Sequence, residues 1–147
     1  MKINVKGQEV EAYALLMKKE FAKEIVEGKK ILEWRTFSEF YSRMFTNEEN
    51  QKLFDMGKLP EGENTIREDI EYVHFYSTGA PWTLDCSIHG ITLVVPIKED
   101  ADWLHDTFGC DDLYPIVEEC DKEGVPEFER PAWYVIVLNE VVGRKGI

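Results

Sequence analysis

The segment 133–142, with the sequence WYVIVLNEVV, constrains the fold more than any other part of the chain. Its first six residues are all apolar, so it lacks the alternation of a strand that has one face in water. A strand of this kind is typical of a sheet that is covered on both faces. The chain of 147 residues is long enough to form those covering layers within one domain. We therefore expect a single domain, residues 1–147, built around a central buried strand.

Shorter periodic patterns predict the other elements. Apolar alternation, or β-branched and aromatic content, favours strands at 10–17, 30–36, 71–77, 84–88 and 91–96. Apolar residues at helical spacing, with capping signals, favour helices at 18–27, 38–45, 46–56, 98–108 and 111–123. His89 and Gly90 separate two of the strands, which indicates a hairpin turn. Because strands and helices do not alternate regularly, we expect an α+β fold with helices packed outside a mixed, mostly antiparallel sheet or small β-barrel.

Composition argues against several classes of protein. No apolar run reaches the ~18 residues that a membrane span needs, and the first residues, MKINVK, lack the apolar core of a secretory signal. The three cysteines cannot all pair and none lies in a CxxC motif, which argues against a disulfide scaffold or a structural zinc site. Glycine-rich phosphate loops and the GxSxG nucleophile turn are absent. We expect a soluble, cytoplasmic protein with no membrane partner, no metal and no cofactor.

Charge is distributed unevenly along the chain. The net charge is −12, but residues 1–44 carry +2 and residues 45–147 carry −14. The first part contains a cluster of basic residues: Lys18, Lys19, Lys23, Lys29, Lys30, Arg35 and Arg43. Since phosphate binding is driven largely by cations, tight binding to long duplex DNA is not expected. If an anion binds, it binds at this cluster; the alternative is that the basic residues form a solvated helix face.

Histidine, cysteine and most carboxylates show no catalytic pattern. The three histidines are far apart in the sequence and none lies in an HExxH motif. His74 falls within an expected strand, where a place in the core or at its edge is favoured over catalysis. Cys120 falls in an apolar helical stripe, where we expect it to be buried and unreactive. Most of the 29 acidic residues must be solvated surface.

The segment 21–35, FAKEIVEGKKILEWR, is the candidate functional site. It combines a helix, a glycine at the helix end, a lysine pair and a strand within 15 residues. Strand alternation puts Glu33 and Arg35 on one face and Trp34 on the other, so we expect Trp34 to pack in the core. By the same alternation, Lys30 joins Glu33 and Arg35 only if it still belongs to the turn.

This segment resembles the opening of the ASCH domains, a group related to the PUA superfamily. Their first helix leads into a strand with the motif G-x-K-x-x-E-x-R, which is matched here by Gly28, Lys30, Glu33 and Arg35. The resemblance is specific over residues 14–36. It implies a PUA-like pseudo-barrel with a cleft between barrel and helices, and residues 38–66 would then be a helical insertion.

The resemblance also implies recognition of RNA, a nucleotide or a modified nucleoside in that cleft. We expect the ligand-binding residues to be Lys29, Lys30, Glu33, Arg35 and Arg43. Some bacterial ASCH proteins are amidohydrolases that remove acetyl from 4-acetylcytidine, with a Lys, a Thr three residues later and a distant Glu. If this chain is such an enzyme, Lys30 and Glu33 are the catalytic residues, although Glu33 stands in the place of the Thr. Candidates for the distant carboxylate are Glu118, Glu119 and Glu123.

The residue types of this segment suit such a ligand. Lys30 is a mobile cation, Arg35 a planar fork for phosphate or a base edge, and Glu33 an acceptor for an amino group. Two alternatives stay open. Glu33 and Arg35 could form an internal ion pair that serves the fold alone, or the chain could be a protein-interaction module that uses the acidic face of its second part.

Overall fold

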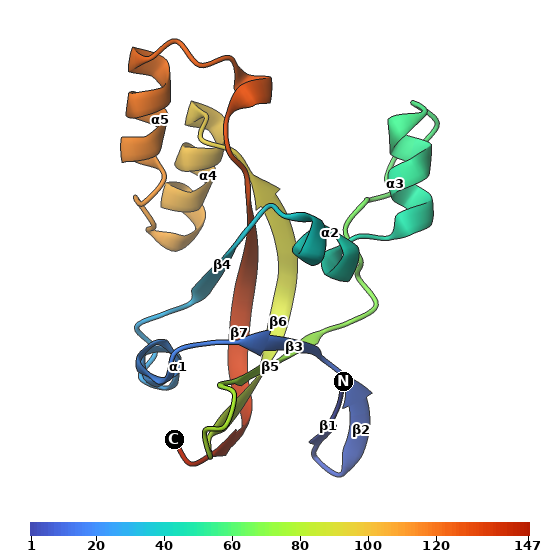
Figure 1. Ribbon diagram of the computed structural model, residues 1–147, viewed down its shortest axis with the longest axis vertical. Coiled ribbons are helices and arrows are strands. Elements are labelled where there is room, and N and C mark those ends of the chain that lie inside the picture. Colours follow the sequence, from blue (N-terminus) through green and yellow to red (C-terminus); the bar gives the residue numbers. More distant parts are fainter.

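Two β-sheets and five α-helices make up the computed structural model, which describes residues 1–147 (Figure 1). The strands are β1 (Lys2–Val5), β2 (Gln8–Glu11), β3 (Tyr13–Leu16), β4 (Leu32–Thr36), β5 (Tyr72–Tyr76), β6 (Thr83–Val94) and β7 (Trp133–Lys145). The helices are α1 (Lys19–Val26), α2 (Glu39–Phe45), α3 (Glu48–Asp55), α4 (Lys98–Phe108) and α5 (Tyr114–Lys122), followed by a 3-10 turn, η1 (Glu127–Glu129). The five-stranded sheet has the order β3-β5-β6-β7-β4 and only β3 and β5 are parallel, so the expected α+β class and mostly antiparallel sheet are confirmed.

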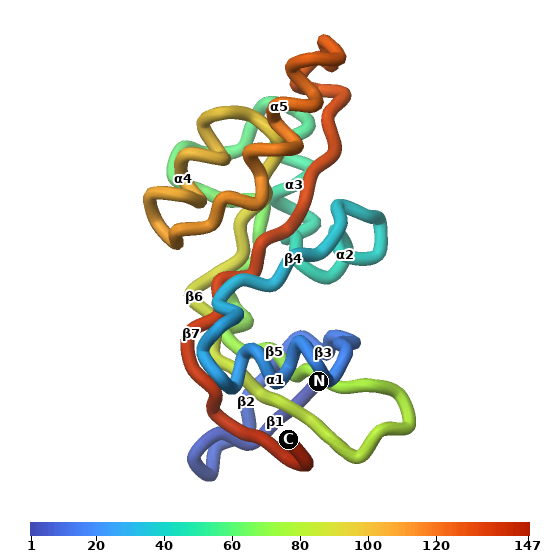
Figure 2. Tube along the Cα trace, turned by 90° about the vertical axis from the view of Figure 1, so that its left-hand side faces the viewer, coloured from blue at the N-terminus to red at the C-terminus, as the bar shows by residue number.

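β7 is the central, buried strand that its sequence predicts. It lies between β6 and β4, and its alternate side chains enter two cores. Tyr134 and Ile136 pack in the larger core, with residues of α1, α2, β3 and β5. Val135 packs in the smaller core, with residues of α4 and α5. Viewed from the side, α4 and α2 lie on opposite sides of the upper sheet (Figure 2). Burial on both faces explains why this strand shows no polar alternation.

The expected hairpin at His89 and Gly90 is wrong. The two predicted strands are the two halves of β6, one strand of 12 residues. Both halves pair with β7 in the same antiparallel direction, with Leu84 opposite Arg144 and Ile91 opposite Ile136. The register shifts three times between Asp85 and Gly90, so the feature that reads as a turn is an irregular stretch within one strand. The long β7 strand provides a partner along the whole of β6, so the chain continues past the glycine without turning back.

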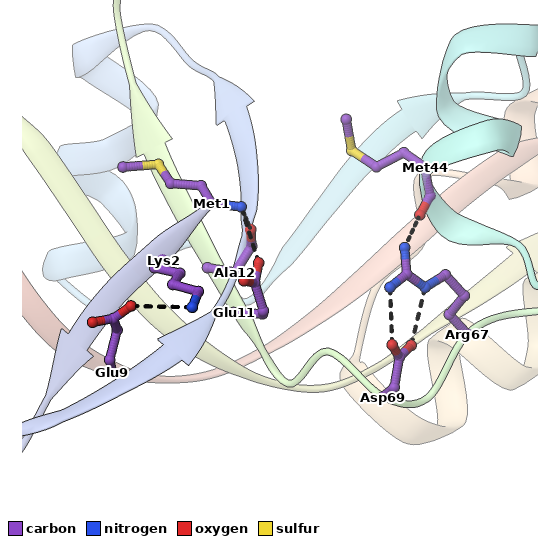
Figure 3. Close-up of polar contacts among 8 residues, drawn as sticks. All are labelled: Met1, Lys2, Glu9, Glu11, Ala12, Met44, Arg67 and Asp69. Carbon is purple, nitrogen blue, oxygen red and sulfur yellow. Dashed lines mark hydrogen bonds and ion pairs between the residues drawn. The ribbon is translucent and has the colours of Figure 1, made fainter.

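The expected first strand, 10–17, is also divided. It breaks at Ala12 into β2 and β3, which belong to different sheets. β2 forms a hairpin with β1 that the sequence analysis missed. The hairpin is closed by two contacts of its ends: the amino group of Met1 donates to Glu11 Oε2 at 3.2 Å, and Lys2 Nζ lies 3.3 Å from Glu9 Oε1 (Figure 3).

Local signals place most helix ends correctly. α1 ends before Gly28, whose φ of +76° favours glycine. The Ser38 hydroxyl accepts a hydrogen bond from the Tyr41 N–H, as an N-cap does. The cap of α3 is Asn47 and not Thr46, and α5 begins at Tyr114, three residues later than expected. The residues expected as an insertion carry α2 and α3.

The main sheet is curled into a half-barrel and does not close. Its two edge strands, β3 and β4, have no backbone pairing with each other, so a closed barrel is not formed. β4 rises from α1 to α2, and the end of β3 leads into α1 (Figure 1). The candidate segment therefore lies where the two edges of the half-barrel approach each other. None of the helices combines the length and the apolar character that crossing a bilayer requires.

Candidate functional site

Glu33 and Arg35 point into the larger core, beside α1 and α2. They pair across the sheet with Ile136 and Tyr134, the β7 residues that face this core. Trp34 points to the other face, where its ring lies 6.1 Å from that of Trp133, so its expected packing role is confirmed. The alternation of β4 thus puts a carboxylate and a guanidinium inside the half-barrel.

Lys30 joins this pair because it precedes the strand. β4 begins only at Leu32, and the turn after α1 brings Lys30 Nζ to 3.7 Å from Glu33 Oε2. Lys30 Nζ also lies 5.6 Å from the centroid of the Phe21 ring, which is a cation–π contact. Lys30, Glu33 and Arg35 form one group, which we call the charged cluster. Because Lys30 lies in the turn and not in β4, its side chain reaches the face of the sheet that carries Glu33 and Arg35.

Glu33 is the buried centre of the charged cluster. Its residue exposure is 8%, and burial raises the pKa of its carboxyl above the usual value although the charges of Lys30 and Arg35 oppose the shift. Arg35 Nε lies 3.5 Å from Glu33 Oε1, an ion-pair distance without a hydrogen bond. Glu33 Oε2 and Arg35 Nε are both buried and have no hydrogen-bond partner. Since buried polar atoms normally have one, these two unpaired atoms require an explanation.

The outer end of Arg35 holds three elements together. Its Nη1 donates to Tyr41 Oη at 2.9 Å, and Tyr41 lies on α2. Its Nη2 donates to the carbonyl oxygen of Leu16 at 2.7 Å, at the end of β3. Arg35 itself lies on β4, so one side chain connects the two edge strands that the backbone leaves unpaired. This role in the fold supports the internal ion pair that the sequence left open as an alternative.

Two of the five expected ligand-binding residues lie outside the charged cluster. Lys29 is exposed and pairs with Glu27, with 2.8 Å between Nζ and Oε2. Arg43 is exposed on α2 and pairs with Glu39. Both pairs are between neighbours in the sequence and both are in water. The structure therefore brings together Lys30, Glu33 and Arg35, but neither Lys29 nor Arg43.

Lys30 is the member of the cluster that meets surface hollows. One hollow of about 560 Å³ lies between the turn after α1 and the residues that follow α4, with Lys30, Trp34 and Asp111 in its lining. A second, of about 250 Å³, is lined by Lys30, Val26 and Asn139 among others. Neither Glu33 nor Arg35 lines either hollow. A ligand would therefore meet Lys30 first.

The candidates for a distant catalytic carboxylate do not reach the cluster. Glu118 and Glu119 are exposed on α5, and Glu123 follows it. α5 lies at the top of the molecule, whereas α1 and the start of β4 lie in the lower half in both views (Figures 1 and 2). Glu33 is the one carboxylate within ion-pair distance of Lys30, and the other carboxylates that line its hollow are Glu24, Asp111 and Asp112.

The remaining titratable residues have structural surroundings. His74 is buried on β5, and its Nδ1 contacts Asp85 Oδ1 on the neighbouring strand, so its expected place in the core is confirmed. Cys120 is buried, as expected, and burial raises the pKa of Cys86 to about 12. No group of three or more His, Cys, Asp or Glu residues lies close enough to hold a metal ion.

Sequence reasoning missed three contributors to the cluster. They are the Tyr41 hydroxyl, the Phe21 ring and the carbonyl oxygen of Leu16. Tyr41 and Phe21 read as apolar helix residues; Tyr41 packs against the larger core as its spacing predicts, whereas Phe21 is exposed and contacts Lys30. A backbone carbonyl leaves no signal in the sequence, so the contact with Leu16 depends on the tertiary fold alone.

Comparison of the chain with protein-family models, with curated proteins and with solved structures yields no match.

Proposed function

We propose that this protein is an ASCH-type domain of PUA-like fold that binds RNA, a nucleotide or a modified nucleoside beside the charged cluster. The half-barrel with α1 and α2 against its concave face is compatible with the barrel and cleft of that group. The motif residues Lys30, Glu33 and Arg35 lie together, as a shared binding site requires.

One observation carries the proposal. Glu33 Oε2 and Arg35 Nε are a buried acceptor and a buried donor without partners, and the partly exposed Lys30 lies next to them. Both atoms are buried and line neither hollow, so a ligand meets the cluster at Lys30, whose ammonium can bind a phosphate or an acceptor on a base edge. Phe21, which is 41% exposed and contacts Lys30, offers an aromatic face on which a base can stack.

Charge favours a small ligand. The 14 net negative charges of residues 45–147 repel a long polyanion, whereas a single nucleotide or a short strand can meet Lys29 and Lys30, although Asp111 and Asp112 line the same hollow. A noncatalytic role also has more support than hydrolysis of an acylated nucleoside. Lys30 faces Glu33, which stands where the hydrolase pattern has a Thr, and no second carboxylate lies within ion-pair distance of Lys30.

The test is a thermal-shift screen with nucleosides, nucleotides, short RNAs and 4-acetylcytidine. A ligand that binds only the folded state raises the Tm. We expect a shift in the wild type that is lost in Lys30→Ala and retained in Lys52→Ala. Lys52→Ala is the matched control, because it removes the same charge from a side chain on α3 that is 71% exposed, pairs with Glu48 and lines neither hollow.

For each variant, the Tm with ligand is compared with the Tm of the same variant without ligand. A change in the stability of the unliganded variant therefore does not affect the measured shift. Equal shifts in both lysine variants, or no shift with any compound at millimolar concentration, would leave the charged cluster with a role in the fold only. Release of acetate from 4-acetylcytidine, lost in Lys30→Ala, would instead establish the hydrolase alternative.

A further inference from the structure

The upper half of β6 is a free strand edge. β5 pairs with β6 only from Thr83 to Ser87. From Gly90 to Val94 the sole strand neighbour of β6 is β7. The segment that leads from α3 to β5 passes beside this part of the strand without pairing with it (Figure 1). One side of β6 therefore presents its backbone to the surroundings over about half its length.

The direction of the ladder shows which groups are free. The N–H of Leu138 donates to the carbonyl of Ile31, on the side of β4. The backbone N–H and C=O groups of its neighbour Val137 therefore point to the other side, toward β6. Because hydrogen bonding alternates along an antiparallel strand, Gly90, Thr92 and Val94, opposite Val137, Val135 and Trp133, bond to β7. The N–H and C=O groups of Ile91 and Leu93 then point to the open side. The next N–H on this side, that of Val95, donates to Asp100 Oδ2 at 2.8 Å, which ends the free stretch.

This edge lacks two of the usual protections. Natural sheets guard exposed edges with charged side chains or proline. Residues 88–95, IHGITLVV, contain neither, and Leu93 is 42% exposed. The segment is also rich in β-branched residues, which favour pairing with another strand. Such an edge is a template for an added strand.

A hollow lies beside this edge, and its lining combines apolar residues with acidic residues. We call the acidic residues its rim. The hollow of about 340 Å³ beside β6 is lined by Ile70, Ile88 and Ile91, together with Glu68 and Glu71. Both glutamates are exposed, and neither takes part in an ion pair of the molecule.

The one arginine of the lining does not cancel these charges. Arg67 donates twice to the carboxylate of Asp69, at 3.0 and 2.9 Å, and once to the carbonyl of Met44 (Figure 3). Residues 61–71 as a whole carry a net charge of −4. The rim is therefore negative.

We propose that the free edge of β6 binds an extended peptide segment that carries lysine or arginine side chains. The peptide backbone would pair with Ile91 and Leu93, alternate apolar side chains would enter the hollow, and basic side chains would face Glu68 and Glu71. A second copy of this chain is disfavoured as the occupant, because each copy carries a net charge of −12. The inference concerns a surface distinct from the charged cluster and does not depend on the proposed nucleotide site.

The probe is a fluorescein-labelled octapeptide of alternating valine and lysine, with binding followed by fluorescence anisotropy. We expect the wild type to bind it and not to bind the alternating valine–glutamate peptide. Leu93→Pro removes an N–H that the fold does not use, and we expect it to weaken binding about tenfold or more. Leu93→Ala keeps that N–H and removes only side-chain contacts, so it is the matched control and retains most of the affinity.

A second measurement leaves the protein unchanged. Peptides N-methylated at alternate residues should divide into two sets, one that binds and one that does not, because only one set of N–H groups faces β6. Equal binding of the lysine and glutamate peptides, or equal affinities of Leu93→Pro and Leu93→Ala, would overturn the proposal. Concentration-dependent dimerisation that Leu93→Pro abolishes would overturn it in favour of self-pairing.

Discussion

The sheet has two kinds of edge. The edges formed by β3 and β4 face each other and are connected through Arg35, whose Nη2 donates to the carbonyl of Leu16. The edge formed by the upper half of β6 faces outward and has no such connection. Polar side chains distinguish the two: β4 carries Glu33 and Arg35, whereas residues 88–95 carry no charge.

The comparison shows that a single buried arginine side chain can connect two strands that do not pair. β3 and β4 do not pair with each other, so the backbone leaves the barrel open. The long arginine side chain spans the remaining gap, and Glu33 supplies the opposite charge that its burial requires. No comparable side chain covers β6, so its edge stays available. Unpaired strand backbone thus occurs in two forms in this sheet: a side chain of the charged cluster bonds to it at β3, and nothing bonds to it at the upper half of β6.

The largest expected effect comes from Arg35→Met. The methionine keeps part of the apolar stem but leaves Glu33 with only Lys30 as a counter-ion, and it removes the hydrogen bonds to Tyr41 and Leu16. We expect the free energy of unfolding to fall by about 3 kcal/mol, as when a buried ion pair loses one partner. Urea unfolding followed by circular dichroism measures it.

Arg43→Met is the control for that experiment. Arg43 is 78% exposed and pairs with Glu39 in water, so its replacement should change the free energy of unfolding by no more than about 0.5 kcal/mol. Equal losses in the two variants would show that Arg35 does not connect the edges.

Adjacent proline substitutions in β6 test the open edge in the folded protein. Thr92→Pro removes an N–H that bonds to β7 and leaves a buried carbonyl without its donor, whereas Leu93→Pro removes an N–H on the open side. We expect Thr92→Pro to cost about 1–3 kcal/mol more than Leu93→Pro. Urea unfolding of both variants decides the point, and the reverse order would mean that the free side of β6 is assigned wrongly.

The pH dependence of Glu33→Gln sharpens the comparison further. Burial raises the pKa of Glu33 in the folded state, so the folded protein binds more protons than the unfolded chain between the usual value of 4.5 and the raised value. The protonation of Glu33 therefore contributes to the free energy of unfolding of the wild type, and this contribution falls as the pH rises through this window. Glu33→Gln has no such contribution, because glutamine does not titrate.

The stability of Glu33→Gln relative to the wild type should accordingly increase with pH from about 4.5 upward, by about 1.4 kcal/mol for each unit by which the pKa is raised. The measurement is the urea midpoint of both proteins from pH 3.5 to 7. A difference that stays constant over this range would mean that Glu33 is as well solvated in the folded state as in the unfolded chain.

Local patterns predicted most elements of this fold. The helical spacing of residues 98–108 matches α4 at both ends, and Gly28 and Ser38 mark real helix boundaries. The alternation of β4 correctly separated Glu33 and Arg35 from Trp34. Such features depend on residues a few positions apart, which the sequence shows directly.

The candidate site was predictable only in part. Spacing alone brought Glu33 and Arg35 together, but the place of Lys30 depended on where the turn gives way to the strand. Lys29 and Arg43 were included on charge, and each turned out to pair with a neighbour in the sequence. Counting basic residues does not show which of them a local carboxylate already holds.

The sequence by itself determined the helices, the alternation of β4 and the burial of β7, because propensity, capping and periodicity act over one or two turns of chain. Only the tertiary structure decided that β6 is one strand, that β3 runs parallel to β5, and that Arg35 reaches the carbonyl of Leu16. Each of these depends on which distant segment offers hydrogen-bonding groups at the right distance. The whole fold determines which segment this is, because local sequence preferences do not select a bulge or a parallel pairing. Either is favoured only when the partner strand is in place.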